Sequence, residues 1–95
     1  MVKALKIEAK DNVAVLLGPA CKGDILEIDG FCQPVNEEIP FGHKVALADI
    51  HAGAGVIKYG EVIGCATSEI KAGDWVHDHN VTSDRGRLKE GGYPG

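Results

Sequence analysis

Three histidines of this chain lie in two short segments whose residue types could bind a metal or an anion. His43 follows a Pro40-Phe41-Gly42 turn, and His77 and His79 are two residues apart. In a β-strand, side chains two residues apart point to the same face. Two imidazoles on one face and a third from a glycine loop predict a site for a divalent metal or an anionic substrate. The alternative is that these are half-exposed surface histidines without a ligand.

Three further residues are candidates for binding an acidic substrate. Lys44 and Lys58 each carry an ammonium group that could pair with a carboxylate. Tyr59 could donate a hydrogen bond from its hydroxyl to a hydroxyl group of the substrate. The alternative for Lys58 and Tyr59 is a hairpin turn in which the tyrosine ring covers the core, and a lysine such as Lys44 is often only solvated.

The neighbours of the histidines receive structural roles. In a regular strand, Asp78 and Asn80 would lie on the opposite face, which makes them turn or surface groups rather than ligands. Trp75 would share the histidine face and is expected to pack on the core. His51 lies in a glycine corner, where we expect it to take no part in chemistry.

Length and composition indicate one small globular domain. The chain has 95 residues, a net charge of −4 and 13 glycines, about twice the average share of glycine. An acidic chain is a poor partner for nucleic acid, because phosphate binding needs a basic face. The apolar run 13–17 is too short to span a membrane, and residues 1–6 lack the apolar core of a signal peptide. We therefore expect a cytoplasmic protein that binds neither membranes nor nucleic acid.

The cysteines do not suggest a disulfide framework. Cys21, Cys32 and Cys65 are odd in number and show no CxxC spacing. In a cytoplasmic protein such residues are expected to be small apolar residues or free thiols.

A short glycine motif recurs three times and is expected to form the corners of the domain. Its copies are Ala20–Ile25, Asp49–Gly53 and Glu69–Val76. The second and third copies share an acidic residue, Ile, any residue, Ala and Gly, whereas the first has Cys21 where we place the isoleucines. Each glycine could adopt the left-handed conformation that ends a single helical turn.

Apolar alternation predicts short strands between these corners. Leu5 and Ile7 are expected to face the core, as are Leu26 and Ile28, with a turn at Asp29-Gly30. The expected strands are 5–8, 13–17, 26–29, 45–47, 55–59, 61–66 and 75–81. No segment shows a sustained 3.6-residue apolar period, which would indicate a long helix. The sequence therefore predicts an all-β domain over residues 1–81.

The last segment, residues 82–95, differs in character from the rest. It is polar and glycine-rich, with too few apolar residues to form a core. We expect a tail or linker, and the alternative is an arm that orders against another protein.

Four of these features, in this order, carry a resemblance to a known family. They are Ile39–Lys44, the corners at Asp49-Ile50 and Glu69-Ile70, the segment Val56–Gly64, and the segment Trp75–Asn80. Together they resemble the SAF-type N-terminal domain of altronate dehydratases. The same module occurs in galactarate dehydratases and as the small subunit of sulfolactate sulfo-lyases. The resemblance extends over nearly the whole chain up to Val81.

The resemblance implies a β-clip (SAF-like) fold and a part in removing water from a sugar acid such as altronate. It also implies a much larger catalytic subunit or domain as partner, and a divalent metal, expected to be iron(II). The reaction takes a proton from the carbon beside the carboxylate, and a metal can stabilise the resulting enediolate as a Lewis acid. His43, His77 and His79 are the candidates for metal binding or acid–base catalysis, and Lys44, Lys58 and Tyr59 for substrate binding.

Two other roles are compatible with the same residues. The chain could be a non-catalytic binding or assembly module, or the small subunit of a sulfolactate sulfo-lyase. Which sugar acid is used, and whether the module self-associates, does not follow from the residues.

Overall fold

The computed structural model describes residues 1–82, apart from the side chain of Phe31, and this part of the chain is all β with no helix. The predicted tail falls, from residue 83 onward, outside the described residues. Nine strands are present in residues 1–82. They are β1 (Val2–Leu5), β2 (Val13–Leu16), β3 (Ile25–Ile28), β4 (Phe31–Pro34), β5 (Lys44–Ala46), β6 (Gly55–Lys58), β7 (Glu61–Ala66), β8 (Trp75–Val76) and β9 (Val81–Thr82).

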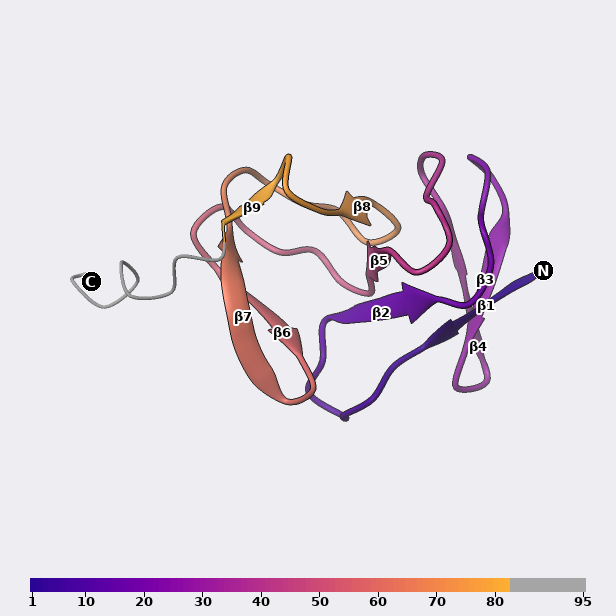
Figure 1. Cartoon of the computed structure of the whole chain (residues 1–95), viewed down its shortest axis with the longest axis horizontal. Coiled ribbons are helices and arrows are strands. Elements are labelled where there is room, and N and C mark those ends of the chain that lie inside the picture. The colour runs from indigo at the N-terminus through magenta and orange to yellow at the C-terminus, as the bar shows by residue number, and fades with distance from the viewer. Residues whose placement is uncertain (83–95) are drawn as a thin grey trace.

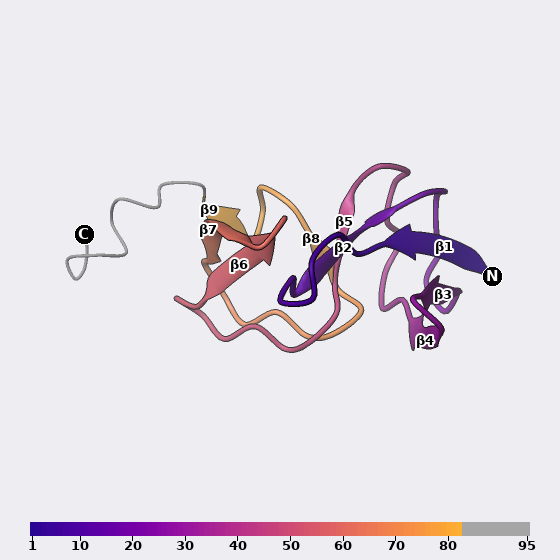
Figure 2. The same cartoon turned by 90° about the horizontal axis from the view of Figure 1, so that it is seen from below.

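The strands form two sheets, with β6, β7 and β9 at one end of the molecule, β1, β3 and β4 at the other, and β2, β5 and β8 between them (Figure 1). The larger sheet has the order β4-β3-β1-β2-β5-β8, and the smaller has the order β6-β7-β9. β1 pairs with β3 in parallel, while the other pairs are antiparallel. Figure 2 shows the β6-β7-β9 sheet beside β2 and β5, with β3 and β4 at the far end. This arrangement of short, curled strands agrees with the β-clip fold that the resemblance implies.

The β2–β5 pair separates two hydrophobic cores. Alternate residues of a strand point to opposite faces. Accordingly Leu16 and Val45 belong to one core, whereas Val13 and Ala46 belong to the other. Both strands are thus buried on both sides, and each core depends on the same pair of strands.

The glycine corners are hydrogen-bonded turns rather than the single helical turns expected from the sequence. In each of the three copies the fourth turn residue donates its amide to the carbonyl of the first, as Asp24 does to Cys21 at 2.9 Å. Gly23, Gly53 and Gly73 occupy the third position with φ near +90° (91°, 87° and 93°). That φ is typical of a type II turn, which needs glycine there.

The turn predicted at Pro40-Phe41-Gly42 is present, and it is a fourth corner of the same kind. Gly42, with φ 83°, sits third in the turn Pro40–His43. Each of the four turns follows a buried residue in an isolated β-bridge: Ala20 pairs with Ile39, and Ile50 pairs with Ile70. The residue equivalent to the isoleucines in the first copy is therefore Ala20, not Cys21, which is exposed.

The predicted alternation of the strand at 26–29 was correct. Leu26 and Ile28 are fully buried, and Asp29-Gly30 forms the turn to β4. The prediction for the first strand was wrong in its bounds and in its buried face, because residues 5–8 were expected and β1 runs from Val2 to Leu5. Ala4 pairs with Leu16 and faces the core, so that Leu5 and Ile7 remain 45% and 43% exposed. A shift of one residue reverses the faces of a strand.

Two adjacent polar residues, Asp11 and Asn12, join the sheets. The Asp11 carboxylate accepts hydrogen bonds from the amides of Gly60 at 2.7 Å and Glu8 at 3.0 Å. The Asn12 side chain accepts from the Ile57 amide at 2.7 Å and donates to the Gly55 carbonyl at 3.0 Å. These bonds fix β6 and the β6–β7 turn against the segment that leads into β2.

The cysteines form no disulfide among the described residues. Cys21, Cys32 and Cys65 are all free thiols, as expected. Within residues 1–82 we find no helix long and apolar enough to cross a membrane.

The corner glycines allow a matched test of turn conformation against close packing. Gly23 and Gly73 have nearly the same φ, but a Cβ at Gly23 would meet no atom within 4 Å, whereas one at Gly73 would lie 2.5 Å from the Pro34 carbonyl oxygen. We expect Gly23→Ala to destabilise the domain by about 1–2 kcal/mol through backbone strain alone, and Gly73→Ala by about 2 kcal/mol more through the clash. Urea denaturation of the two variants measures the difference, and equal losses would contradict the close approach.

The Asp11 carboxylate predicts a defined pH dependence of stability. Burial raises its pKa, but the amides of Gly60, Glu8, Tyr59 and Ile7 outweigh that effect and hold the pKa below its ordinary value of 3.8. A carboxylate with a lowered pKa stabilises the fold above the ordinary pKa and loses that contribution as the pH falls through the folded-state pKa. We expect Asp11→Asn to lower the unfolding free energy at pH 7, with the gap to the wild type closing below pH 3.8.

Denaturation midpoints measured from pH 7 downward test this expectation. Asp29→Asn is the matched control, because Asp29 lies in an exposed turn with φ 48°, a conformation that Asn also tolerates. A gap for Asp11→Asn that stays constant through the acid range would show that the charge of Asp11 does not act as described.

Candidate functional site

The pairing of β5 with β8 brings together the two segments that carry the histidines. Lys44 pairs with Val76, and Val45 pairs with Trp75. His43 directly precedes β5, and its carbonyl accepts the Leu16 amide at 2.9 Å. His77 directly follows β8. Residues about 30 positions apart in the sequence therefore meet because two short strands pair (Figure 1).

The segment 75–81 is not the single strand predicted from its alternation. β8 ends at Val76, residues 77–80 form a turn, and β9 begins at Val81 in the other sheet. Asn80 closes this turn: its Oδ1 accepts the His77 amide at 3.0 Å and its Nδ2 donates to the Trp75 carbonyl at 2.8 Å. Asn80 is thus a turn residue as expected, although it is buried rather than on the surface.

The three histidine rings nevertheless gather, because all of them contact Trp75. The His43, His77 and His79 ring centroids lie 5.6, 5.6 and 5.0 Å from the indole. His77 stacks on the indole at an interplanar angle of 13°, and its ring is 4.4 Å from that of His43. Trp75 itself is half buried and packs against the core that contains Leu16 and Val45, as expected for a residue at the edge of the core.

A hydrogen bond fixes the orientation of His43 relative to Trp75. The indole Nε1 donates to His43 Nδ1 at 3.1 Å. Indole nitrogen is a donor only, so Nδ1 must act as the acceptor.

An open cleft of about 460 Å³ lies beside this cluster. It is lined on the polar side by Lys44, His77 and Asp78, with the hydroxyl residues Thr67 and Thr82. Ile63 and Val81 supply its apolar lining. Of the residues predicted from the sequence, Lys44 and His77 reach the cleft. Asp78, Thr67 and Thr82 were missed, and the two threonines carry no spacing signal that would have revealed them.

The surroundings of Lys44 lower its pKa and so disfavour its charged form. Burial lowers its pKa below the ordinary lysine value, and the charge of Lys58 lowers it further. The carboxylate of Asp78 acts in the opposite direction and raises the pKa. An incoming carboxylate would also favour the charged form of Lys44. The cleft therefore combines a partly buried cation with an imidazole and hydroxyls, a set suited to binding an acidic, hydroxylated molecule.

Lys58 and Tyr59 do not line this cleft. Tyr59 occupies the turn between β6 and β7 with φ 58°, and it is exposed. The Lys58 ammonium lies 4.7 Å from the centre of the Tyr59 ring. The segment is a hairpin turn, but the exposed tyrosine ring does not cover the core as the alternative named above expected. Lys58 is not among the residues that line the cleft, although its charge lowers the pKa of Lys44. Substrate binding by these two residues remains a prediction.

The arrangement does not provide a complete metal site by itself. Among residues 1–82, no group of three or more His, Cys, Asp or Glu side chains is placed to hold a metal ion. Metal binding by His43, His77 and His79 therefore remains a prediction, and it would need ligands from outside this part of the chain.

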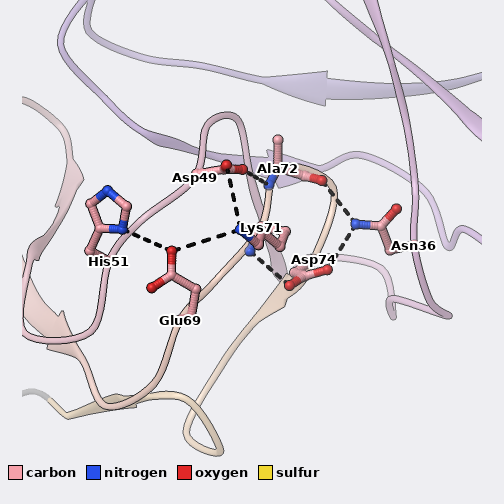
Figure 3. A network of polar contacts seen from close by, with 7 residues as sticks. All are labelled: Asn36, Asp49, His51, Glu69, Lys71, Ala72 and Asp74. Carbon is pink, nitrogen blue, oxygen red and sulfur yellow. Dashed lines mark hydrogen bonds and ion pairs between the residues drawn. The ribbon is translucent and has the colours of Figure 1, made fainter.

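His51 lies in a separate polar network on the exposed corners (Figure 3). Its Nδ1 is 2.8 Å from Glu69 Oε2. The Lys71 Nζ lies 3.8 Å from Asp49 Oδ2 and 3.9 Å from Glu69 Oε2. Exposed ion pairs of this kind contribute little to stability. The network orders two corner turns, and Asp74 further accepts the Lys71 amide at 2.8 Å. His51 is not among the residues that line the cleft.

Comparison with known proteins places this geometry in context. Residues 2–84 match the family described as the altronate/galactarate dehydratase SAF domain. The chain is 42% identical over 89 residues to an altronate dehydratase of Escherichia coli (strain K12), covering 94% of this chain and 18% of the relative. It is 41% identical over 78 residues to the galactarate dehydratase (L-threo-forming) of the same organism, covering 81% and 14%.

A relative of similar size is also found. The chain is 35% identical over 85 residues to the (2R)-sulfolactate sulfo-lyase subunit alpha of Chromohalobacter salexigens, covering 82% of this chain and 90% of the relative. The chain thus spans less than a fifth of the length of the two dehydratases but nearly the whole of this subunit.

The charges around the cleft predict opposite effects of two substitutions on Lys44. Lys58→Met removes a positive charge that lowers the pKa of Lys44, so we expect that pKa to rise towards the ordinary lysine value. Asp78→Asn removes the carboxylate that raises it, so we expect the pKa to fall further. A pH titration of the Lys44 side-chain NMR signals measures both shifts. Shifts of the same sign in the two variants would contradict the geometry of the cleft.

Proposed function

The chain belongs to the altronate/galactarate dehydratase SAF domain family, and from this premise we propose that it serves a sugar-acid dehydratase as a small subunit or N-terminal domain. Its relatives are dehydratases and lyases, and in the dehydratases the matching region is a small part of a longer chain. The proposed activity therefore belongs to the assembled enzyme, in which a large catalytic portion completes the site. On its own, this chain is expected to show no turnover.

The cleft beside the histidine cluster is the observation that carries this proposal. Lys44 and His77 face one open space of about 460 Å³ together with Thr67 and Asp78. A sugar acid carries a carboxylate and several hydroxyls, which match an ammonium, an imidazole and hydroxyl groups. The proposed role of Lys44 is to bind the carboxylate as a point charge. The proposed role of His77 is to donate to an oxygen of the substrate or to move a proton.

A divalent metal such as iron(II), implied by the resemblance, fits this chain only in part. A bound metal would supply Lewis-acid stabilisation of the enediolate. Residues 1–82 hold no complete ligand set for it, so most ligands would come from the large catalytic portion. The contribution of this chain is then to bind and orient the acid in the cleft and to exclude water from one side of it.

A second candidate function has its own support. The sulfolactate sulfo-lyase subunit alpha is nearly the same length as the matched region of this chain. A separate small subunit that binds sulfolactate, which also carries a carboxylate, would use the same cleft. A substrate screen of the assembled enzyme with altronate, galactarate and (2R)-sulfolactate distinguishes the two functions. A third possibility is a module that only assembles the enzyme, with all catalysis in the partner.

Substitutions in the cleft of the assembled enzyme test the proposed role. We expect His77→Gln or Lys44→Met to lower kcat/KM about 10- to 150-fold, because each removes a hydrogen bond to a charged group, worth about 1.5–3 kcal/mol. His51→Gln is the matched control, since His51 lies in the exposed corner network, and its activity should stay within about twofold of the wild type.

Assembly of each variant with the large portion is checked by size-exclusion chromatography. Full activity of both cleft variants in an intact complex would favour the assembly module. Turnover by the purified 95-residue chain alone would contradict the shared site.

A further inference from the structure

We infer that Trp75 is a positioning residue that holds His43 as the neutral tautomer with its proton on Nε2. The observation is the hydrogen bond from Trp75 Nε1 to His43 Nδ1 at 3.1 Å. A neutral imidazole has one N–H and one lone pair. Since indole can only donate, the lone pair of His43 lies on Nδ1 and the proton on Nε2. His43 therefore offers a ligand an N–H group and no free lone pair.

Both partners of this hydrogen bond are held by their backbones. The Trp75 amide donates to Glu37 Oε2 at 3.1 Å, and its carbonyl accepts from Asn80 Nδ2 at 2.8 Å. On the other side, the His43 amide donates to the Pro40 carbonyl at 3.2 Å, within a turn that has Gly42 at φ 83°. The pairing of Val45 with Trp75 sets the distance between the two segments. The tautomer is thus fixed by the fold rather than by a mobile surface contact.

The polarity of this contact is the reverse of that found around metal-bound histidines. A ligating histidine binds the metal with one nitrogen and donates its other N–H to a carboxylate, carbonyl or water. His43 instead faces a donor. It could ligate a metal through Nε2 only by losing the indole hydrogen bond or by becoming an imidazolate. While the indole hydrogen bond holds, the free group of His43 is an N–H donor, which suits an oxygen acceptor such as a carboxylate rather than a metal ion. His43 is not among the residues that line the cleft.

The same reasoning divides the three histidines of the cluster into two classes. His43 has its tautomer set by Trp75, whereas His77 and His79 contact the indole through their rings at 5.6 and 5.0 Å. A metal contributed by the large catalytic portion could use either of those two. The chemical class for His43 is an anionic or carbonyl oxygen, and this part of the inference rests on the proposed function.

Nuclear magnetic resonance of the ¹⁵N-labelled full chain tests the tautomer directly. In a long-range ¹H–¹⁵N spectrum recorded above neutral pH, we expect His43 to show a protonated Nε2 and an unprotonated Nδ1. His51 serves as an internal reference, because its Nδ1 faces the Glu69 carboxylate at 2.8 Å and should carry the proton. A wild-type spectrum in which His43 carries its proton on Nδ1 would overturn the inference without any variant.

Two variants separate the positioning role of Trp75 from simple packing. Trp75→Phe keeps an aromatic ring but removes the N–H, so the Nδ1-protonated tautomer of His43, which the indole donor excludes, should become measurably populated beside the Nε2-protonated one. His77→Gln removes the ring that lies 4.4 Å from His43 but leaves the indole, so the tautomer should persist. A single Nε2-protonated tautomer that survives Trp75→Phe in a folded chain would contradict the role of Trp75.

Addition of Zn²⁺ alone to the wild-type chain provides the second measurement. We expect the His43 nitrogen signals to remain in place, because the lone pair is used by the indole. A zinc-induced shift of His43 Nε2 with loss of its proton would overturn the assignment to an oxygen acceptor. These readouts do not require turnover, so their outcome is separable from that of the kinetic test of the cleft.

Discussion

The antiparallel pairing of β2 with β5 is the constraint on which the rest of the structure depends. Val13, Ala14 and Val15 pair with Ala46, Val45 and Lys44. The two faces of this ribbon are the walls of two different cores. A substitution that distorts the ribbon therefore disturbs both cores at once, because both of its strands contribute buried residues to both clusters. The same ribbon presents Lys44 at the cleft and aligns β5 with β8.

Small size and glycine turns explain why the cleft is open. A domain of this length buries only about 60–65% of its unfolded surface, and here that surface is divided between two cores. Four of the connections in residues 1–82 are turns in which a glycine with positive φ occupies the third position. Such turns reverse the chain within four residues and leave little material to cover a binding site. The openness of the cleft is consistent with the proposal that a large catalytic portion completes the site.

Much of the fold could be read from the sequence, whereas the site geometry could not. Alternation at Leu26 and Ile28 and the glycines of the corners gave the all-β class and most strands. The strand at 75–81 was predicted from the same alternation, but Asn80 bonds to the backbone of residues 75 and 77. Local side-chain bonds of Asn compete with strand pairing, and alternation does not register them. The Asp78-His79-Asn80 sequence before Val81 is rich in turn-forming residues and could have indicated the turn.

The clustering of the histidines has a different cause from the one that the spacing suggested. The imidazoles of His77 and His79 were expected to share a strand face. They lie near each other instead because both contact the Trp75 ring from within a turn. The position of His43 depends on the pairing of β5 with β8, which is a contact between distant segments. Neither the indole hydrogen bond nor the threonines of the cleft follow from spacing, because both depend on which strands pair.

The charge of Lys44 relates the open cleft to the large catalytic portion that we propose as its partner. Lys44 is already partly desolvated, and burial lowers its pKa. Covering the cleft with a large catalytic portion would remove more water and weaken the charged form further, unless a carboxylate arrives at the same time. In a water-poor site the attraction between that carboxylate and Lys44 is stronger than in solution. In the proposed enzyme, closure and acid binding would therefore favour each other.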